Sequence, residues 1–533
     1  MKVLVLGGSG VFGSRLAQLL VRDGHNVTVA GRNLSNAQSM AESLGCGALQ
    51  LDRDGDLSVL PGYDVLVDAA GPFHTYGADP YRLARGAISG GVHYLDLSDN
   101  APFCEGISAL DAEAKAANVC AISGMSSVPA LSSAAVRALV GDDHPDKIEV
   151  AILPGNRTPR GLSVIASILS QAGRPMKVFR NGKWTSVPGW SDPKTYDLPG
   201  EIRRQGWLIE VPDVTLFPKH FAAQSVIFRA GLELAAMRYG LSAFARFRRR
   251  VPVPITGPIL RVFKLAADLL SPFGSDSGGM LVSVTVGQEQ RSWRLRVDHG
   301  DGPFIPAIAV RALLRRDALP VGSGPALETI TLTEAETDMS DLHTFSEKSN
   351  VVRKTIFQQV LGPDFDNLPK AVRATHLTRD TSRWSGNASV TRGEGLWSRC
   401  LAWLFRFPKA AGTIPVEVTK TVTPKGETWL RSFGGSRFRS HLAATPQGMT
   451  ERFGPFTFRV DLTVANGSLN YPVSGGRLGP LPLPTWLLPI SEAREFEDDG
   501  RFHFDVKLSA PITGGLLVHY EGTLSQKAPT SND

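Results

Sequence analysis

The chain has 533 residues, of which 42% are hydrophobic and 20% charged, and it carries a formal net charge of +6 at pH 7 with a pI near 9.1. This length exceeds that of one ordinary domain and predicts two or three. The positive charge is mild for the size. It favours an anionic cofactor or a membrane surface and does not argue for a nucleic-acid partner.

The cysteines and the hydropathy pattern indicate a cytoplasmic protein. Cys46, Cys104, Cys120 and Cys400 form neither a CxxC pair nor a zinc-ligand spacing, so we expect reduced thiols and no metal site. The N-terminus lacks the pattern of a secretory signal, and no apolar run approaches the ~20 residues that span a bilayer. We therefore expect a cytoplasmic protein, with peripheral membrane contact left open.

A strand, a glycine turn, a helix and a second strand are predicted at the start of the chain. The apolar run 2–6 reads as a strand, and leucines at helical spacing follow the glycines before the β-rich run 26–30. Glycines at this spacing let the backbone approach a pyrophosphate at a helix N-terminus. The residues predicted to contact the dinucleotide here are Gly7, Gly8, Ser9, Gly10, Val11, Phe12 and Gly13.

Two further residues bear on the choice of cofactor. NAD enzymes place an acidic residue at the end of the second strand, whereas this chain has Arg32 there. An arginine pairs with a 2′-phosphate, so we predict NADP over NAD; the alternative is an exposed loop arginine. Asp52, after the third strand, is predicted to contact the adenine or else to be an exposed loop carboxylate.

Strands and helices continue to alternate up to about residue 122. Strands are predicted at 47–52, 64–70, 92–97 and 118–122, with helices between them. This pattern predicts a doubly wound parallel sheet whose ligands lie at the carboxyl ends of the strands. The loops that should converge at that edge are 7–13, 70–77, 96–100 and 123–129. Among them, Ala70, Gly71 and Pro72 are predicted to contact the cofactor.

The converging loops also carry groups that can move a proton. Tyr76 and Asp96 are the predicted catalytic residues, and both have structural alternatives: Tyr76 covers the cofactor, or Asp96 caps backbone at the end of its strand. The other candidates on these loops are His74, Ser98, Asp99 and Ser126.

The order of several short motifs resembles that of a known family. These motifs are the glycine-rich start, Ala30-Gly31-Arg32, Ala70-Gly71-Pro72-Phe73 followed by Tyr76-Gly77, and the run 93–98. Together they look like saccharopine dehydrogenase-like oxidoreductases, closely over residues 1–130 and loosely to about 345. The resemblance implies an NADP-type Rossmann domain, a second domain after it, and redox chemistry at a C–N, C–O or C=C centre. It does not imply saccharopine as the substrate.

Residues 146–345 are predicted to form an α+β domain that returns to the Rossmann domain. Strands are expected at 148–153, 280–287 and 292–297, a hairpin around Asn181-Gly182, and apolar helices at 225–250 and 258–271. The first of these helices ends in a basic run that includes Arg246, Arg248, Arg249 and Arg250. These arginines either snorkel over a protein core, or they end a surface helix that rests on anionic lipid or covers a hydrophobic substrate.

Residues 350–525 are predicted to be β-rich, as an antiparallel barrel or a strongly curved sheet. A short helix near 355–361 should precede the strands, and one helix near 395–407 should lie among them. This region resembles an uncharacterised domain fused behind such reductases. Nearby aromatic residues indicate either an apolar ligand site or an ordinary core: Trp397, Trp403, Phe405 and Trp429. Residues 526–533 read as a disordered tail.

The predicted fold class is therefore α/β: a Rossmann-type domain over 1–145, an α+β domain over 146–345 and a β-rich domain over 350–525. The predicted function is an NADP-dependent oxidoreductase that acts on a hydrophobic small molecule or lipid-like substrate. The alternatives are a non-catalytic NADP-binding sensor and a lipid or membrane-surface protein that acts through its C-terminal domain. The sequence gives no indication of the oligomeric state.

Overall fold

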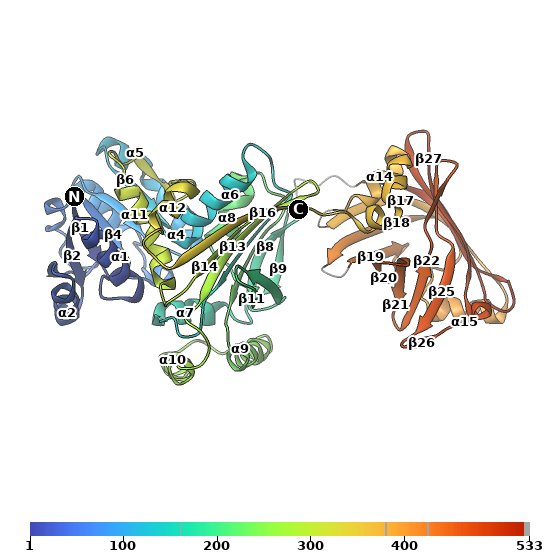
Figure 1. Cartoon of the computed structure of the whole chain (residues 1–533), viewed down its shortest axis with the longest axis horizontal. Helices are drawn as coiled ribbons and strands as arrows, with labels where there is room; N and C mark the ends of the chain where they lie inside the picture. Colours follow the sequence, from blue (N-terminus) through green and yellow to red (C-terminus); the bar gives the residue numbers. More distant parts are fainter. Residues whose placement is uncertain (160, 379–380, 424–425, 527–533) are drawn as a thin grey trace. The chain divides into compact units, whose positions relative to one another are not determined.

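The computed structural model describes residues 1–159, 161–378, 381–423 and 426–526. The chain divides into two compact units, Met1–Val351 and Val352–Asp533 (Figure 1). Of the predicted disordered tail, Gln526 is the last residue of a strand, and 527–533 lie outside the described residues. No helix in the described part of the chain combines the length and the apolar character needed to cross a bilayer.

The first sheet of the first unit is parallel, which confirms the predicted doubly wound sheet. Its strand order is β15-β6-β5-β4-β1-β2-β3. Alternate residues of β1 face two separate cores: Val3 and Val5 pack with α1, and Leu4 and Leu6 pack with α3. The bounds are β1 Lys2–Leu6, β2 Asn26–Gly31, β3 Gly47–Gln50, β4 Val65–Asp68, β5 His93–Asp96, β6 Cys120–Ser123 and β15 Gly322–Pro325.

Helices cover both faces of this sheet, as parallel strands require. The leucines predicted to form the buried stripe of the first helix, Leu16, Leu19 and Leu20, are fully buried. The helices of this region are α1 Val11–Arg22, α2 Leu34–Leu44, α3 Arg82–Ser89, α4 Ala101–Gly106, α5 Asp111–Ala116 and α6 Ser132–Val140.

A second, mixed sheet completes the first unit, in the order β10-β11-β12-β7-β13-β14-β16, with the β8–β9 hairpin attached to β12. Its strands are β7 Lys147–Leu153, β8 Pro175–Arg180, β9 Lys183–Pro188, β10 Lys194–Leu198, β11 Ile202–Leu208, β12 Val226–Gly231, β13 Gly278–Val286, β14 Glu289–Val297 and β16 Thr344–Val352. The accompanying helices are α7 Leu162–Gln171, α8 Pro212–His220, α9 Ala235–Arg248, α10 Gly257–Leu270, α11 Ile308–Leu314 and α12 Leu332–Asp338.

The prediction of one helix over 225–250 is wrong in its first part. Residues Val226–Gly231 form β12, which pairs in parallel with β7 and antiparallel with β11, and α9 begins only at Ala235. β12 has neighbours on both edges, and apart from Arg229 its residues are apolar or glycine. Its sequence therefore lacks the regular polar and apolar alternation that would separate it from a buried helix.

After the second sheet the chain returns to the first. β15 pairs in parallel with β6, with Gly322 opposite Cys120. The Rossmann sheet is therefore built from two segments of the sequence separated by the whole second sheet except its last strand, β16.

The second unit is built on an antiparallel sheet of thirteen strands that curves strongly in Figure 1, as the curved-sheet alternative predicted. The order is β23-β24-β27-β28-β29-β17-β18-β19-β20-β21-β22-β25-β26. Its strands are β17 Thr381–Arg392, β18 Ala411–Thr423, β19 Gly426–Phe433, β20 Ser436–Thr445, β21 Gly448–Phe453, β22 Phe456–Val460, β23 Thr463–Ala465, β24 Ser468–Asn470, β25 Val473–Leu478, β26 Leu481–Pro482, β27 Ile490–Asp498, β28 Arg501–Ser509 and β29 Leu516–Gln526, and its helices are α13 Ile356–Leu361, α14 Lys370–His376 and α15 Leu396–Leu404.

Candidate functional site

The turn between β1 and α1 leaves no room for a side chain at Gly7 or at Gly13. Gly7 has φ +77°, and a Cβ built on it would lie 2.7 Å from the Ala70 Cα. A Cβ on Gly13 would lie 2.3 Å from the carbonyl oxygen of Gly7. These contacts bring α1 close to the sheet and bring the end of β4 against the turn, as a dinucleotide fingerprint requires.

The N-terminus of α1 fits a phosphate group. Its N-cap is Gly10, which has no side chain to occupy the space in front of the helix; the Gly10 N–H donates to Gly7 O at 2.9 Å. The first amides of an α-helix have no acceptor within the helix, so those of Val11 and Phe12 are available to an anion. The residues present therefore fit the pyrophosphate of a dinucleotide.

Arg32 and Asp52 follow the ends of β2 and β3, the strands beyond β1 in the sheet. Both side chains are exposed. The exposed Arg32 guanidinium fits the predicted 2′-phosphate contact. Asp52 uses its Oδ1 to accept the N–H of Asp54 at 3.1 Å, so part of its hydrogen-bonding capacity is taken by the local turn.

Tyr76 lies in a buried cluster beside β4. Its hydroxyl donates to Oδ2 of the fully buried Asp68 at 2.9 Å, and the Arg53 guanidinium lies 3.6 Å from its ring centroid. Burial raises the pKa of Tyr76 far above its usual value, and the Asp68 charge raises it further. Burial also raises the pKa of Asp68 to about 6. This environment favours a role for Tyr76 in holding the loop after β4.

Asp96 joins two of the converging loops. Its Oδ1 accepts the N–H of Ser98 at 2.9 Å, the Ser123 hydroxyl at 2.9 Å and the N–H of Gly124 at 2.8 Å. Burial raises the pKa of this carboxyl, and the three hydrogen bonds offset only part of that effect, so the pKa is about 7. The geometry matches the capping alternative given for Asp96 above.

A cavity of about 500 Å³ lies within the first unit, between the Rossmann loops and the second sheet. Neither Tyr76 nor Asp96 is among the described residues that line it. From the Rossmann side it is lined by Phe12, Ala69, Gly71, Pro72, Phe73, Leu97, Asp99, Ser126, Ser127 and Val128. The opposite walls come from β7, β12, β13, β14, α7, α9 and α10, and include Ile152, Phe228, Met280, Leu295, Ile165, Ile168, Met237, Leu241, Phe263 and Leu270.

Asp99 is a carboxylate at the Rossmann end of this mostly apolar cavity. Its Oδ2 accepts the hydroxyl of Ser167 from α7 at 3.3 Å. The Asp99 side chain faces the cavity and is exposed there, while the protein atoms around it raise the pKa of its carboxyl. Of the loop residues predicted to move a proton, Asp99 and Ser126 line the cavity. Ser98 instead caps the chain, its Oγ accepting the N–H of Asn100 at 3.2 Å, and His74 is exposed.

Sequence reasoning missed the far walls of the cavity. They come from segments between Ile152 and Pro306 that are apolar like any core, so no local pattern marks them. The sequence does indicate the near wall: Asp99 follows a parallel strand, and this position places its side chain at the edge of the sheet where ligands bind.

The fold and the turn define the N-terminal region as a dinucleotide-binding domain of Rossmann type. Residues 3–122 match the family model described as "Saccharopine dehydrogenase NADP binding domain", and residues 368–524 match "Domain of unknown function (DUF4166)". Residues 3–122 are thus an NADP-binding domain of the saccharopine dehydrogenase type. NADP as cofactor is confirmed at the level of this domain family.

Several solved structures share parts of the fold. Saccharopine dehydrogenase (L-Glu forming) from Saccharomyces cerevisiae is 15% identical, with 65% of this chain and 99% of that chain covered and a TM-score of 0.45. BdcA in complex with NADPH is 20% identical over 23% of this chain and 68% of that chain, with a TM-score of 0.19. The RhlG/NADP complex from Pseudomonas aeruginosa is 17% identical over 23% and 69%, with a TM-score of 0.20. No curated protein matches the chain significantly.

Proposed function

We propose that the chain is an NADP-dependent oxidoreductase that acts on a hydrophobic, lipid-like small molecule in the cavity of the first unit. The position of the cavity carries the proposal. It lies at the carboxyl ends of β4, β5 and β6, on the side of β1 away from Arg32. A dinucleotide held by the β1–α1 turn with its adenosine half toward Arg32 has its nicotinamide half on the cavity side.

Each part of the cofactor has residues of this chain to hold it. The turn from Gly7 to Gly13 holds the pyrophosphate, Arg32 holds the 2′-phosphate, and Ala70, Gly71 and Pro72 flank the nicotinamide half. When bound, the cofactor supplies or accepts the hydride. The apolar walls exclude water from the reacting carbon.

Asp99 is the residue that exchanges a proton with the substrate in this proposal. It lies at the Rossmann end of the cavity, and its raised pKa allows the protonated form to persist closer to neutral pH than for a fully solvated aspartate. The Ser167 hydroxyl orients it. Asp99 therefore donates a proton during reduction or accepts one during oxidation.

The lining favours an apolar substrate. Apolar side chains from the second sheet, from α1, α7, α9 and α10, and from the loops after the Rossmann strands form most of the surface, so a large apolar body is needed to fill it. A charged metabolite would leave its charge without partners over most of this surface.

The helices α9 and α10 favour access from a membrane surface. Their inner residues, including Met237 and Phe263, line the cavity. Their outer residues are apolar: Val262 is 65%, Leu265 60% and Leu269 68% exposed on α10. The remaining exposed apolar residues here are Tyr239, Phe247, Val251 and Phe273.

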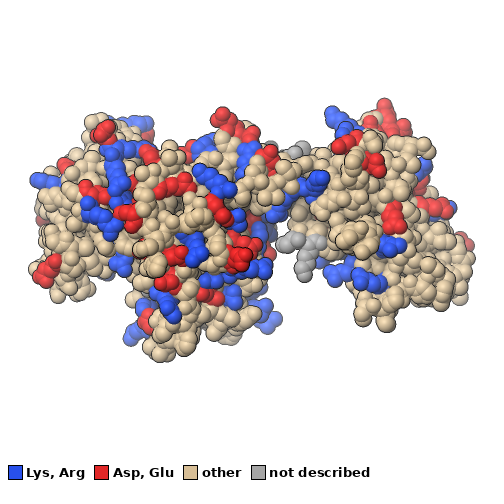
Figure 2. All heavy atoms as spheres, viewed as in Figure 1, with Lys and Arg blue, Asp and Glu red and all other residues tan. Residues whose placement is uncertain are grey.

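Basic residues border this face, as on helices that bind anionic lipid. Arg246, Arg249, Arg250 and Arg261 are exposed, whereas Arg248 is buried and donates to the carbonyls of Leu169, Ala172 and Val253, so it does not belong to the surface group. Figure 2 shows largely uncharged surface with basic groups along the edge of the first unit where Figure 1 draws α9 and α10.

Cofactor binding is tested by thermal unfolding with NADPH and with NADH. NADPH at 100 times its Kd should stabilise the first unit by about 2.7 kcal/mol, and NADH at the same concentration should stabilise it less. Mass spectrometry of compounds retained by the purified protein then identifies the substrate. The Asp99→Asn variant should keep NADPH binding and lose turnover of that compound. NADPH binding without turnover of any retained compound would favour a sensor, and no response to either cofactor would refute the proposal.

Membrane contact is tested by flotation with phosphatidylcholine vesicles that do or do not contain phosphatidylglycerol. The chain should float with the anionic vesicles, and a Leu265→Ser and Leu269→Ser double variant should not. Phe345→Ser is the matched control, because Phe345 is 55% exposed on β16, outside α9 and α10. Equal flotation of the double variant would count against the membrane face.

A further inference from the structure

The second unit contains a cavity of its own, of about 160 Å³, against the antiparallel sheet. An apolar cavity of roughly 150 Å³ holds a molecule the size of benzene. Of the four aromatic residues predicted to flank a ligand site, Phe405 and Trp429 line this cavity, whereas Trp397 and Trp403 are exposed on α15. Its other aromatic lining residues are Phe407, Phe433, Phe438, Phe453, Phe458, Tyr471, Phe502, Phe504 and Tyr520.

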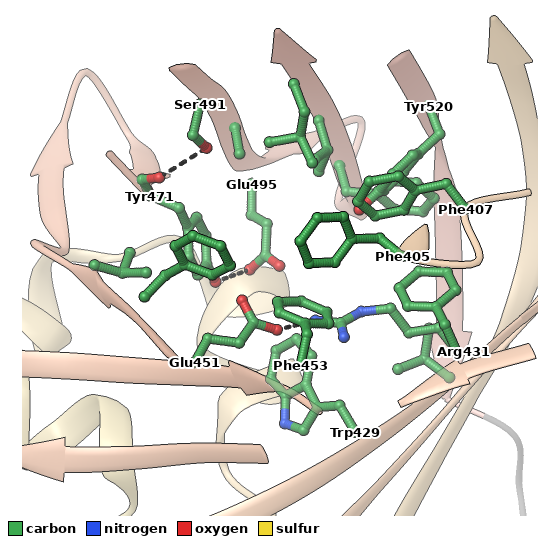
Figure 3. Close-up of a pocket in the computed structure, with 18 of the residues that line it drawn as sticks. Phe405, Phe407, Trp429, Arg431, Glu451, Phe453, Tyr471, Ser491, Glu495 and Tyr520 are labelled. Atoms are coloured by element: carbon green, nitrogen blue, oxygen red, sulfur yellow. Dashed lines mark hydrogen bonds and ion pairs between the residues drawn. The ribbon is translucent and has the colours of Figure 1, made fainter. Parts of the chain in front are cut away.

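One wall of this aromatic cavity carries a buried carboxylate. Glu495, on β27, is 9% exposed, and its Oε2 accepts hydrogen bonds from the Tyr471 hydroxyl at 2.7 Å and from Nε2 of His376 at 2.5 Å. Its second oxygen, Oε1, accepts no hydrogen bond from any residue that the structure describes. Figure 3 shows Glu495 between Tyr471 and the ring of Phe405. The wall therefore presents an acceptor that lacks a donor.

The surroundings keep this carboxylate ionised. Burial lowers the pKa of His376 to about 4, so its imidazole is neutral at neutral pH and Nε2–H donates to Glu495. Burial by itself would raise the pKa of Glu495, but His376, Lys420 and Tyr471 together lower it. An ionised oxygen is a stronger acceptor than a neutral one.

The other charges at the wall have partners. Lys420 Nζ donates to Thr375 O at 2.7 Å and lies 3.9 Å from the centroid of the Trp429 ring. The Arg431 guanidinium donates to Oε1 of Glu451 at 3.1 Å, as Figure 3 shows. Glu427 is a third carboxylate here, and it is buried; it accepts the Trp429 Nε1–H at 2.9 Å and interacts with Lys420. The two cations therefore already face three carboxylates, and a neutral ligand adds no further charge to this cluster.

A buried charge cluster of this kind is costly, and apolar residues of the same shape would usually give an equal or more stable core. The free-energy cost of burying these charges is understandable if the cluster binds a ligand. A carboxylate oxygen that faces an aromatic cavity selects a molecule with an apolar body and a hydrogen-bond donor, because such a molecule fills the space and completes the network.

We propose that this cavity is a binding site for a small neutral molecule with a ring-sized apolar body and one hydroxyl group, which donates its hydrogen bond to Oε1 of Glu495. The aromatic side chains contact the body of the ligand. The site lies within the second unit, and its residues take no part in the proposed oxidoreductase activity.

Benzyl alcohol and ethylbenzene are matched probes, because they differ by a hydroxyl in place of a methyl group. Their binding to the full chain is measured by ligand-observed NMR titration. Benzyl alcohol should bind at least as tightly as ethylbenzene, despite the cost of removing its hydroxyl from water. Glu495→Gln should weaken benzyl alcohol binding by about tenfold, since a hydrogen bond to a charged carboxylate is replaced by a weaker one to a neutral amide. Ethylbenzene binding should change less than about threefold, because that probe makes no such bond.

A second variant keeps the test informative if Glu495→Gln disturbs folding. Ala493 lines the cavity, and Ala493→Leu fills part of it without touching the charge cluster's hydrogen bonds. This variant should weaken both probes, and thermal unfolding reports whether each variant is folded. The proposal is overturned if wild type binds neither probe, if it binds ethylbenzene more tightly than benzyl alcohol, or if a folded Glu495→Gln variant weakens the two probes equally.

Discussion

The hydroxyl of Tyr76 donates to Oδ2 of Asp68 at 2.9 Å, and this bond ties the loop after β4 to the strand that it leaves. Oδ1 of Asp68 accepts the N–H of Ala70 at 2.9 Å, so both carboxylate oxygens hold the same loop. The loop carries Gly71 and Pro72 to the edge of the cavity. Tyr76 thus positions the cavity wall from outside it.

Tyr76→Phe should destabilise the first unit by about 1 to 3 kcal/mol, because it removes the hydroxyl that donates to Oδ2 of a buried carboxylate. NADPH affinity should change little. Urea unfolding and a fluorescence titration measure the two effects. Tyr239→Phe is the control: Tyr239 is 71% exposed, and its change should stay within about 0.5 kcal/mol. An unchanged unfolding free energy for Tyr76→Phe would contradict the positioning role.

Arg32→Ala should weaken NADPH binding by about 10- to 100-fold, which corresponds to the loss of a charged hydrogen bond worth about 1.5 to 3 kcal/mol. NADH binding should hardly change, because NADH has no 2′-phosphate. Calorimetric titration with both cofactors measures the difference. Arg203→Ala, at an exposed arginine paired with Asp197, should affect neither cofactor. Equal losses of affinity for NADPH and NADH would contradict the role given to Arg32.

Gly13→Ala should destabilise the first unit by about 2 kcal/mol or more and abolish NADPH binding, because the new methyl group meets the Gly7 carbonyl oxygen at 2.3 Å. Neither backbone segment can move without separating α1 from the sheet. Gly62→Ala is the control, since nothing lies within 4 Å of a Cβ at that position. Thermal unfolding measures both. A stable, cofactor-binding Gly13→Ala protein would mean that the turn is looser than described.

Asp213→Asn should flatten the pH dependence of stability. Burial raises the pKa of Asp213, on α8, to about 8, while its usual value is 3.8. The folded state therefore holds a proton that the unfolded state releases, and stability falls as pH rises from about 4 through about 8, by about 1.4 kcal/mol per pKa unit. Urea unfolding at pH 5 and at pH 8 should show a smaller loss in the variant than in wild type. An equal loss in both would refute this assignment.

The Rossmann half of the fold and of the site could be predicted because each of its features is local. The glycine spacing of Gly7 to Gly13 and the arginine at position 32 are read within one strand-turn-helix-strand unit. The second sheet could not be predicted fully from the sequence, for a physical reason. Val226–Gly231 is a central strand whose only charged residue is Arg229, and an apolar run without regular alternation is equally compatible with a buried helix.

The candidate site shows the same division. Asp99 and Ser126 were placed on converging loops by the rule that parallel strands direct their carboxyl ends to one edge. The residues that line the cavity opposite them, such as Phe228, Met280 and Leu295, meet only through long-range pairing of the second sheet. Their sequence neighbourhoods are those of an ordinary core.

The pairing of β15 with β6 makes the first sheet depend on a strand that comes late in the sequence. During synthesis from the N-terminus, the strand Gly322–Pro325 emerges after nearly all of the second sheet. Until then the edge of β6 stays uncovered, and nascent chains released early would expose it to other strands. A fragment that ends at residue 145 should consequently self-associate, whereas one that ends at residue 351 contains every strand of both sheets except the last residue of β16. Completion of the first sheet thus requires a strand that is synthesised after nearly all of the second sheet.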